Sequence, residues 1–186
     1  MLFRSIFAAG LAILPQISQA DVVQLSINSD YCAIKQAMTG SADPDCPTPE
    51  FHGATRSIET AAIPPDGEKG YFIHFAFASD VLTKDYQSHL MRLSAVLKSE
   101  ELASLCLKLV GHTDAVGSKN YNLSLSQRRA RTVRLFLVGV AGVGTDRLHS
   151  EGMGEGQTLP GVDSKDPSNR RVEILAREPG ASGCKA

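Results

Sequence analysis

Two kinds of hydrophobic spacing follow one another in the middle of the chain. Every second residue is apolar along one stretch, at Tyr71, Ile73, Phe75 and Phe77. The next apolar residues are separated by four, three and four positions, at Tyr86, Leu90, Leu93 and Leu97. The alternation predicts a strand with one apolar face, and the helical spacing predicts an amphipathic helix that begins near Thr83 or Asp85.

A second strand and a second helix are predicted further along the chain. Residues 105–110 are almost continuously apolar, as expected of a strand covered on both faces, with Lys108 as the exception. The following helix is expected to begin at a capping box of Ser124 and Gln127 and to end near Gly139. Its inward stripe is predicted to contain Ala130, Val133 and Leu137.

Two further strands complete the predicted domain. They cover residues 147–152 and 170–175, and a long loop rich in Gly, Pro and Asp separates them at 154–168. The order strand–helix–strand–helix–strand–strand predicts an α/β (α+β) sandwich, in which helices pack on a mixed sheet. We expect this domain to occupy residues 71–178, with a short tail at 179–186.

Residues 1–20 have the composition of a secretory signal peptide. Arg4 precedes a short apolar run at residues 6–14, and Ser18-Gln19-Ala20 places small residues at a cleavage site. Cleavage before Asp21 would leave an exported chain, and an uncleaved N-terminal anchor is the alternative. No Cys follows this site directly, so a lipoprotein anchor is not predicted.

Residues 21–70 are predicted to form an extension with little core of its own. Clusters of turn-forming residues interrupt it at 43–49 and 63–67. One short helix is expected at 31–38. We therefore predict a stapled extension in front of the domain, not a second domain.

The four cysteines predict disulfide bonds in an exported chain. Three pairings are possible, and we favour Cys32–Cys46 together with Cys106–Cys184. The first closes a short loop, which is worth about 3 kcal/mol in the chain-entropy model. The second is reasonable if the last strand is antiparallel to residues 105–110, because its end then lies near Cys106. The alternative is that Cys106 is a buried free thiol.

The charge balance argues against two classes of partner. The chain has 19 Lys and Arg residues against 20 Asp and Glu residues. Nucleic acids and anionic membrane surfaces attract concentrated positive charge, so neither is expected as a main partner. Three arginines of the second predicted helix are interpreted as a solvated surface: Arg128, Arg131 and Arg134.

One carboxylate and one guanidinium have positions that suit a shared ligand. Asp114 follows the strand at 105–110, and Arg129 lies on the next predicted helix. Ligands of α/β sheets gather beyond the carboxyl ends of the strands. A free amino-acid head group fits this pair, because Asp114 can accept from its ammonium and Arg129 can donate to its carboxylate. Unrelated surface charges or an internal salt bridge are the alternatives.

Several motifs surround this pair in a fixed order: Gly111-x-Thr113-Asp114-x-x-Gly117, Tyr121-Asn122, Leu125-Ser126-x-Arg128-Arg129-Ala130, Gly152-x-Gly154-Glu155 and Asn169-Arg170-Arg171-Val172-Glu173. Together they resemble the OmpA-like peptidoglycan-binding domain, the C-terminal module shared by OmpA, Pal and MotB proteins. The resemblance covers about residues 71–176. The chain departs from the family pattern after Glu155, where four residues intervene before Pro160.

The resemblance implies binding of the diaminopimelate residue in the stem peptide of peptidoglycan. Asp114 and Arg129 match the two residues that contact diaminopimelate in the family. Asn122 matches an Asn that helps to shape the pocket. These three residues are therefore the main candidates for the site.

The resemblance also implies a second group of residues around the pocket. Thr113 and Gly117 match the ligand turn. Arg170 is expected to add positive potential near the site. Asp80 is our choice from the loop after the first strand, which borders the pocket in the family.

We therefore expect a non-catalytic module in the periplasm that binds peptidoglycan and associates with the cell wall and outer membrane. Outer-membrane or periplasmic proteins are the other expected partners, and no cofactor is expected. The alternative is a periplasmic protein-interaction module that uses the same fold without wall binding.

An enzyme is not predicted. His112 and Asp114 share one strand face, but a metal site needs three or four ligands, and Ser124 lacks a nucleophile elbow.

Overall fold

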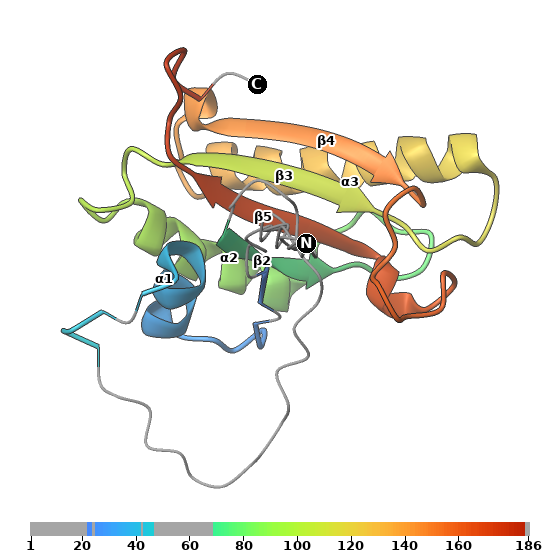
Figure 1. The fold of residues 1–186 in the computed structure, drawn as a ribbon, viewed down its shortest axis with the longest axis horizontal. Helices are drawn as coiled ribbons and strands as arrows, with labels where there is room; N and C mark the ends of the chain where they lie inside the picture. Colours follow the sequence, from blue (N-terminus) through green and yellow to red (C-terminus); the bar gives the residue numbers. More distant parts are fainter. Residues whose placement is uncertain (1–21, 24, 42, 47–68, 185–186) are drawn as a thin grey trace, which may run out of the picture.

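A mixed sheet forms the centre of the protein (Figure 1). The computed structural model describes residues 22–23, 25–41, 43–46 and 69–184. The sheet has the order β1-β2-β5-β3-β4. Its strands are β1 (Val22–Val23), β2 (Lys69–His74), β3 (Cys106–His112), β4 (Leu148–Gly154) and β5 (Arg171–Arg177). β5 lies between β2 and β3 and is antiparallel to both, whereas β4 is parallel to β3.

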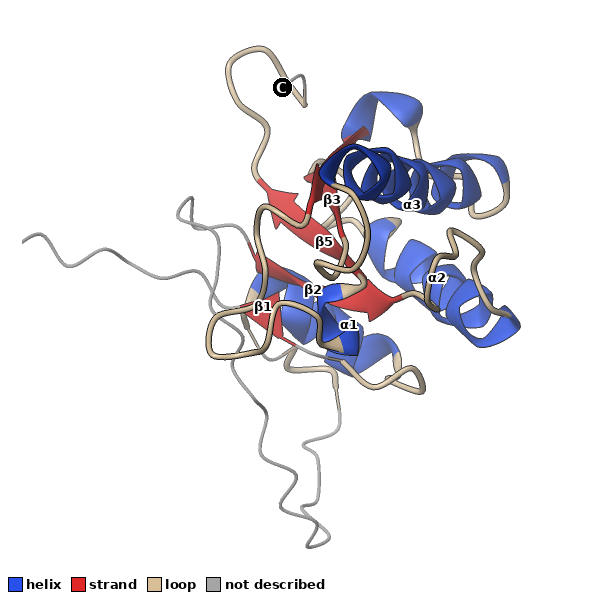
Figure 2. Ribbon diagram, turned by 90° about the vertical axis from the view of Figure 1, so that its right-hand side faces the viewer, coloured by secondary structure: helices blue, strands red, loops and turns tan. Residues whose placement is uncertain are grey.

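The helices cover one face of this sheet. They are α1 (Tyr31–Thr39), α2 (Lys84–Leu97) and α3 (Lys119–Gly139), with short 3-10 helices η1 (Thr145–Arg147) and η2 (Pro167–Asn169). Figure 2 shows α2 and α3 side by side on this face. The expected start of α2 is confirmed, because the Thr83 hydroxyl accepts a hydrogen bond from the Tyr86 N–H.

The start of α3 differs from the prediction. The helix begins at Lys119, and the hydroxyl of Ser118 caps it by accepting from the Tyr121 N–H. Ser124 lies inside the helix, where its hydroxyl accepts from Arg128. The prediction was wrong because the first turn of α3 carries mostly polar residues, so the apolar stripe begins later than the helix does.

The first strand also ends earlier than the alternation predicted. β2 stops at His74, and the chain turns where the Ser79 N–H bonds to the Ala76 carbonyl. Phe75 is buried, but Phe77 lies beyond the strand and is exposed. The carbonyls of Ala76 and Ser79 both accept from Arg129 of α3, so these two carbonyls have partners without a neighbouring strand.

The core lies between the sheet and the three helices. Inward residues of β2, β3 and β5 pack against α2 and α3, and α1 contributes Ile34 and Met38 to the same cluster. The described part of the extension therefore contributes to the core of the domain through α1. A smaller cluster of Phe72, Val110 and Leu175 lies on the other face of the sheet. The predicted class, helices packed on a mixed sheet, is confirmed.

Two disulfide bonds hold the ends of the described chain. The predicted pairs Cys32–Cys46 and Cys106–Cys184 are both present, and the free-thiol alternative for Cys106 is wrong. Cys106 is opposite Arg177 in the antiparallel pair of β3 and β5, which brings the C-terminal tail to the start of β3 as expected.

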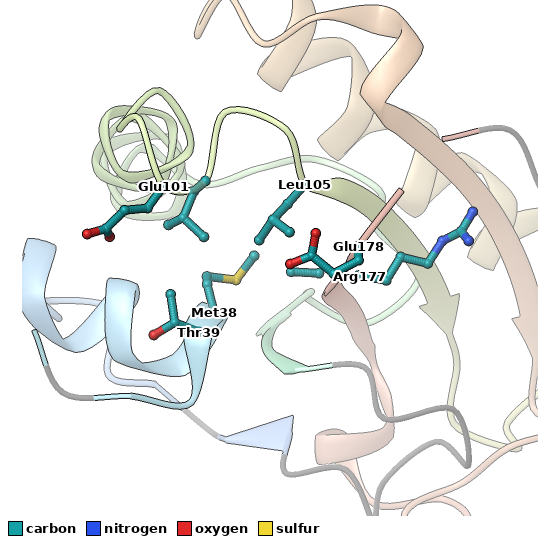
Figure 3. A pocket seen from close by; sticks show the side chains of 8 residues that line it. Met38, Thr39, Glu101, Leu105, Arg177 and Glu178 are labelled. Atoms are coloured by element: carbon teal, nitrogen blue, oxygen red, sulfur yellow. The ribbon is translucent and has the colours of Figure 1, made fainter. Parts of the chain in front are cut away.

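A cleft of about 310 Å³ separates α1 from the end of β5 (Figure 3). Met38, Leu102 and Leu105 form its apolar part. Beside it, the Lys35 ammonium lies 2.5 Å from an Asp43 oxygen and 2.6 Å from a Glu101 oxygen. The pair with Glu101 attaches α1 to the loop before β3, and the pair with Asp43 holds the segment that follows α1. Among the described residues, no helix is both long and apolar enough to cross a membrane. The expected signal peptide, residues 1–20, lies outside the described residues.

Candidate functional site

The candidate site lies where β3 ends, at the right-hand end of the sheet in Figure 1. α3 packs unusually close to the sheet here. A Cβ atom on Gly111 would lie 2.0 Å from the Ser126 carbonyl oxygen, so only Gly permits this approach. Because α3 is so close, the Arg129 guanidinium reaches the His112 carbonyl at the end of β3.

Arg129 is completely buried, with 0% of its surface exposed. Its guanidinium donates to three backbone carbonyls: Ser79 at 2.8 Å, His112 at 2.9 Å and Ala76 at 3.1 Å. Its carbon also lies 5.4 Å from the centre of the Phe75 ring, within range of a cation–π contact. Burial lowers the pKa of Arg129 to about 10, so the group remains charged at neutral pH.

Asp114 lies near Arg129 in the turn after β3 and is buried. Its Oδ2 atom is 3.1 Å from Nη1 of Arg170, and its Oδ1 atom accepts a 3.3 Å bond from the Val116 N–H. The Asn122 amide donates to the Asp114 carbonyl and, at 2.6 Å, to Glu155. These bonds link the turn that carries the carboxylate to the start of α3 and to Arg170, the residue before β5.

A small cleft opens beside these charges. It is lined by Phe77, Ala78, Thr113, Asp114, Val116, Tyr121, Asn122, Leu125, Arg129 and Arg170. Its enclosed volume is about 20 Å³, which is room for about one water molecule. The buried hydroxyl of Thr113 has no hydrogen-bond partner within the described part of the chain. A buried hydroxyl without a partner is costly, so it is suited to bond a ligand.

The structure brings together most of the predicted site residues. Five of them line this one cleft: Thr113, Asp114, Asn122, Arg129 and Arg170. Gly117 does not line it, but its φ of +106° closes the turn beside Asp114. Asp80 lies outside the cleft lining and pairs with Arg128 at 3.0 Å. The pair of Asp80 and Arg128 shows that Arg128 is not merely solvated.

Sequence reasoning missed the apolar residues of the cleft. Phe77, Val116 and Tyr121 line it, yet Phe77 was assigned to a strand face and Val116 to no element. The sequence signal was the break in alternation after Phe77, where Ala78-Ser79-Asp80 replaces the next apolar position. Glu155 was recognised only as part of a motif, although it accepts the short bond from Asn122.

No group of three or more His, Cys, Asp and Glu residues among those described is arranged to hold a metal. The His112 side chain is buried, and its Nε2 lies 3.4 Å from Glu173, a residue of β5. Burial lowers the pKa of His112, although Glu173 opposes this effect.

Comparisons with known proteins identify relatives for this part of the chain. OmpA of Serratia marcescens is 36% identical over 107 residues, which are 56% of this chain and 30% of that protein. OmpA of Buchnera aphidicola is 29% identical over 127 residues, which are 66% of this chain and 36% of that protein. The chain therefore spans about a third of the length of these curated relatives.

Solved structures have the same fold. The peptidoglycan-associated lipoprotein of Burkholderia pseudomallei is 28% identical with a TM-score of 0.50, covering 57% of this chain and 89% of that one. A putative MotB-like protein of Desulfovibrio vulgaris is 24% identical with a TM-score of 0.52, covering 66% of this chain and 80% of that one. The model of the OmpA family matches residues 74–173, more than half of the chain, and this chain therefore belongs to the OmpA family.

Proposed function

We propose that the protein binds peptidoglycan without catalysis, through the free amino-acid head group of diaminopimelate in the stem peptide. The observation that carries this proposal is one cleft that holds a carboxylate, two guanidinium groups and a hydroxyl that has no partner among the described residues. A head group with an ammonium and a carboxylate on one carbon complements such a set. The name of the Burkholderia relative, a peptidoglycan-associated lipoprotein, supports peptidoglycan as the partner.

The contacts assign different roles to the two arginines. Arg129 donates three of its N–H groups to backbone carbonyls. It therefore mainly holds the loop after β2 beside the end of β3, and it supplies positive potential. Arg170 is partly exposed and pairs with Asp114. In our proposal, the ligand ammonium takes the place of Arg170 at Asp114, and the ligand carboxylate then pairs with Arg170. The free hydroxyl of Thr113 donates to the same carboxylate.

The affinity of a single site is expected to be modest. Charge-assisted hydrogen bonds contribute about 1.5–3 kcal/mol each, and the ligand must displace an existing ion pair. Many diaminopimelate residues on one polymer would raise the apparent affinity through avidity. Such a module would keep the protein at the cell wall in the periplasm, where it connects the wall with the outer membrane or a periplasmic complex.

Co-sedimentation with purified peptidoglycan tests this proposal. Asp114→Asn removes the charge and keeps the size of the side chain, so we expect at least about a tenfold loss of binding. Asp146→Asn is the matched control, because Asp146 is exposed and distant from the cleft in the chain. Circular dichroism verifies that both variants fold. Equal binding by the two variants would contradict the proposed site, and would favour the alternative of a protein-interaction module.

A further inference from the structure

The turn that carries Asp114 is held on both sides by backbone hydrogen bonds to other parts of the chain. The Thr113 N–H donates to the Gly154 carbonyl at 2.9 Å, and the Ala115 N–H donates to the Ser164 carbonyl at 2.8 Å. Gly154 is the last residue of β4, whereas Ser164 belongs to the long loop between β4 and β5, which lies at the same end of the sheet (Figure 1). The place of the Asp114 carboxylate therefore depends on where this loop holds the Ser164 carbonyl.

One buried side chain, that of Asn169, holds this loop. It is 0% exposed. Its Oδ1 atom accepts from the Leu159 N–H at 2.7 Å, and its Nδ2 atom donates to the carbonyls of Asp163 at 2.9 Å and Ser164 at 3.4 Å. These contacts use the acceptor and both donors of the amide. Because they reach two separate places in the loop, Asn169 fixes the one relative to the other.

Asn169 is also connected to the other charge of the site. It directly precedes Arg170, whose Nε donates to the Phe75 carbonyl at 3.2 Å and whose Nη1 pairs with Asp114. Asn169 therefore reaches the carboxylate through Ser164 and the guanidinium through the backbone. Its own side chain does not line the cleft, so any effect that it has on a ligand must be indirect.

We infer that Asn169 is a positioning residue for the cleft. It holds the Ser164 carbonyl against the Ala115 N–H and thereby keeps Asp114 where its carboxylate can meet a charged ligand. This inference rests on the proposed function, which gives Asp114 the ligand ammonium. Binding groups must be held to within about 0.5 Å of their working geometry, so a loop that moves away from the turn weakens the site without removing any of its charges.

Asn169→Asp tests the inference, because it keeps the size of the side chain and an oxygen that can accept from Leu159. A carboxylate cannot donate to the carbonyls of Asp163 and Ser164. We expect the variant to bind purified peptidoglycan at least about fivefold more weakly in co-sedimentation, the value for one lost hydrogen bond. Asn169→Ala removes the same donors without burying a charge, and it replaces the first variant if circular dichroism shows that the first does not fold.

Amide hydrogen exchange, measured by NMR without ligand, separates positioning from stability. The Ala115 N–H bonds to the loop, whereas the Thr113 N–H bonds to β4. In the Asn169 variant, exchange at Ala115 should accelerate at least about fivefold more than exchange at Thr113, because only the loop is released. A general loss of stability would accelerate both by the same factor, because global unfolding exposes both groups.

Ser94→Ala is the matched control for the loss of a buried hydrogen bond. The Ser94 side chain is buried in α2, donates to the Met91 carbonyl at 2.7 Å and does not line the cleft. This variant should keep both the binding and the exchange ratio of the unchanged protein.

Three results would overturn the inference and leave the proposed function standing. The folded Asn169 variant could keep the exchange ratio, or it could bind as well as the unchanged protein while Asp114→Asn loses binding. Failure of both Asn169 variants to fold would show a purely structural residue. If the unchanged protein does not sediment with peptidoglycan, the proposed function itself is wrong and the inference fails with it.

Discussion

At each end of β3 an arginine donates to three backbone carbonyls, but the groups around the two arginines differ. At the site end, residues 112–117, Arg129 donates to three backbone carbonyls. At the opposite end, residues 97–106, Arg147 also donates to three, those of Leu97, Leu102 and Leu105. Burial is the main reason that the pKa values of both arginines lie below the ordinary value.

The difference lies in what accompanies each arginine. Beside Arg129 are the carboxylate of Asp114, the partly exposed Arg170 and an unpaired hydroxyl on Thr113. Arg147 connects a turn to the end of α2, and its carbonyl partners all belong to residues 97–105. An arginine that donates to three backbone carbonyls is therefore a structural feature in this protein. The ligand specificity that we propose comes from the groups added around Arg129.

Removing each arginine gives the largest effect that we predict. Arg129→Ala and Arg147→Ala each leave three carbonyls without their charged donor, so we expect each to lower the free energy of unfolding by about 3 kcal/mol or more. Only Arg129→Ala should also abolish binding to peptidoglycan. Urea unfolding and co-sedimentation measure the two quantities separately.

Arg131→Ala is the control for this pair, because Arg131 is an exposed residue of α3. It should change the free energy of unfolding by less than about 0.5 kcal/mol. If Arg147→Ala weakened wall binding as much as Arg129→Ala did, the two ends would be coupled, and the separation of scaffold from site would be wrong.

Periodicity and motif order predicted much of the fold. Strands β2 to β5, the helices α1 and α2 and both disulfide pairs follow from local spacing and from one topological argument about β5 and β3, whereas the two-residue strand β1 was not predicted. The motif order also placed Asp114, Arg129 and Arg170 near one another, as the structure does. Local rules succeed here because apolar faces and turn residues report directly on burial.

The rest depended on contacts that no local pattern encodes. The partners of Arg129 lie up to 53 residues away, and they fix its carbonyl contacts. Arg147 was predicted only as the first residue of a strand, although it lies in η1, because the spacing of a single arginine does not reveal the carbonyls that it contacts. Phe77 continues the strand alternation but lies in a loop, where the carbonyls of Ala76 and Ser79 bond to α3 instead of a strand.

Acid should destabilise the side of the protein where the extension joins α2. The buried His89 ring bonds through Nδ1 to the Ile27 carbonyl, and its Nε2 has no partner among the described residues. Burial lowers the pKa of His89 below its ordinary value of about 6.5. A lowered pKa in the folded state stabilises the protein above about pH 6.5, and this contribution is lost as the pH falls through the lowered value.

Unfolding measured between pH 7.5 and 5 tests this prediction with His89→Gln. Burial also lowers the pKa values of His74 and His112, so the unchanged protein should lose stability in acid through all three groups. The variant should lose less, by an amount smaller than the effect of either arginine. An identical pH dependence in the two proteins would show that the pKa of His89 does not change on folding, and the prediction would be wrong.

The smallest predicted effect concerns strain at the site end. Ala78 has a φ of 50°, and it is the only non-glycine residue with positive φ in the part of the chain that the structure describes. This conformation raises the free energy of a folded alanine by about 1–2 kcal/mol. Glycine removes that strain, but it loses more conformational entropy on folding, which offsets part of the gain. Ala78→Gly should therefore raise the free energy of unfolding by about 0.5–1 kcal/mol. Ala103→Gly, at an exposed turn of the opposite end, should lower it by a similar amount. Thermal unfolding of both variants measures the contrast, and a loss of stability in both would mean that the site end is not strained.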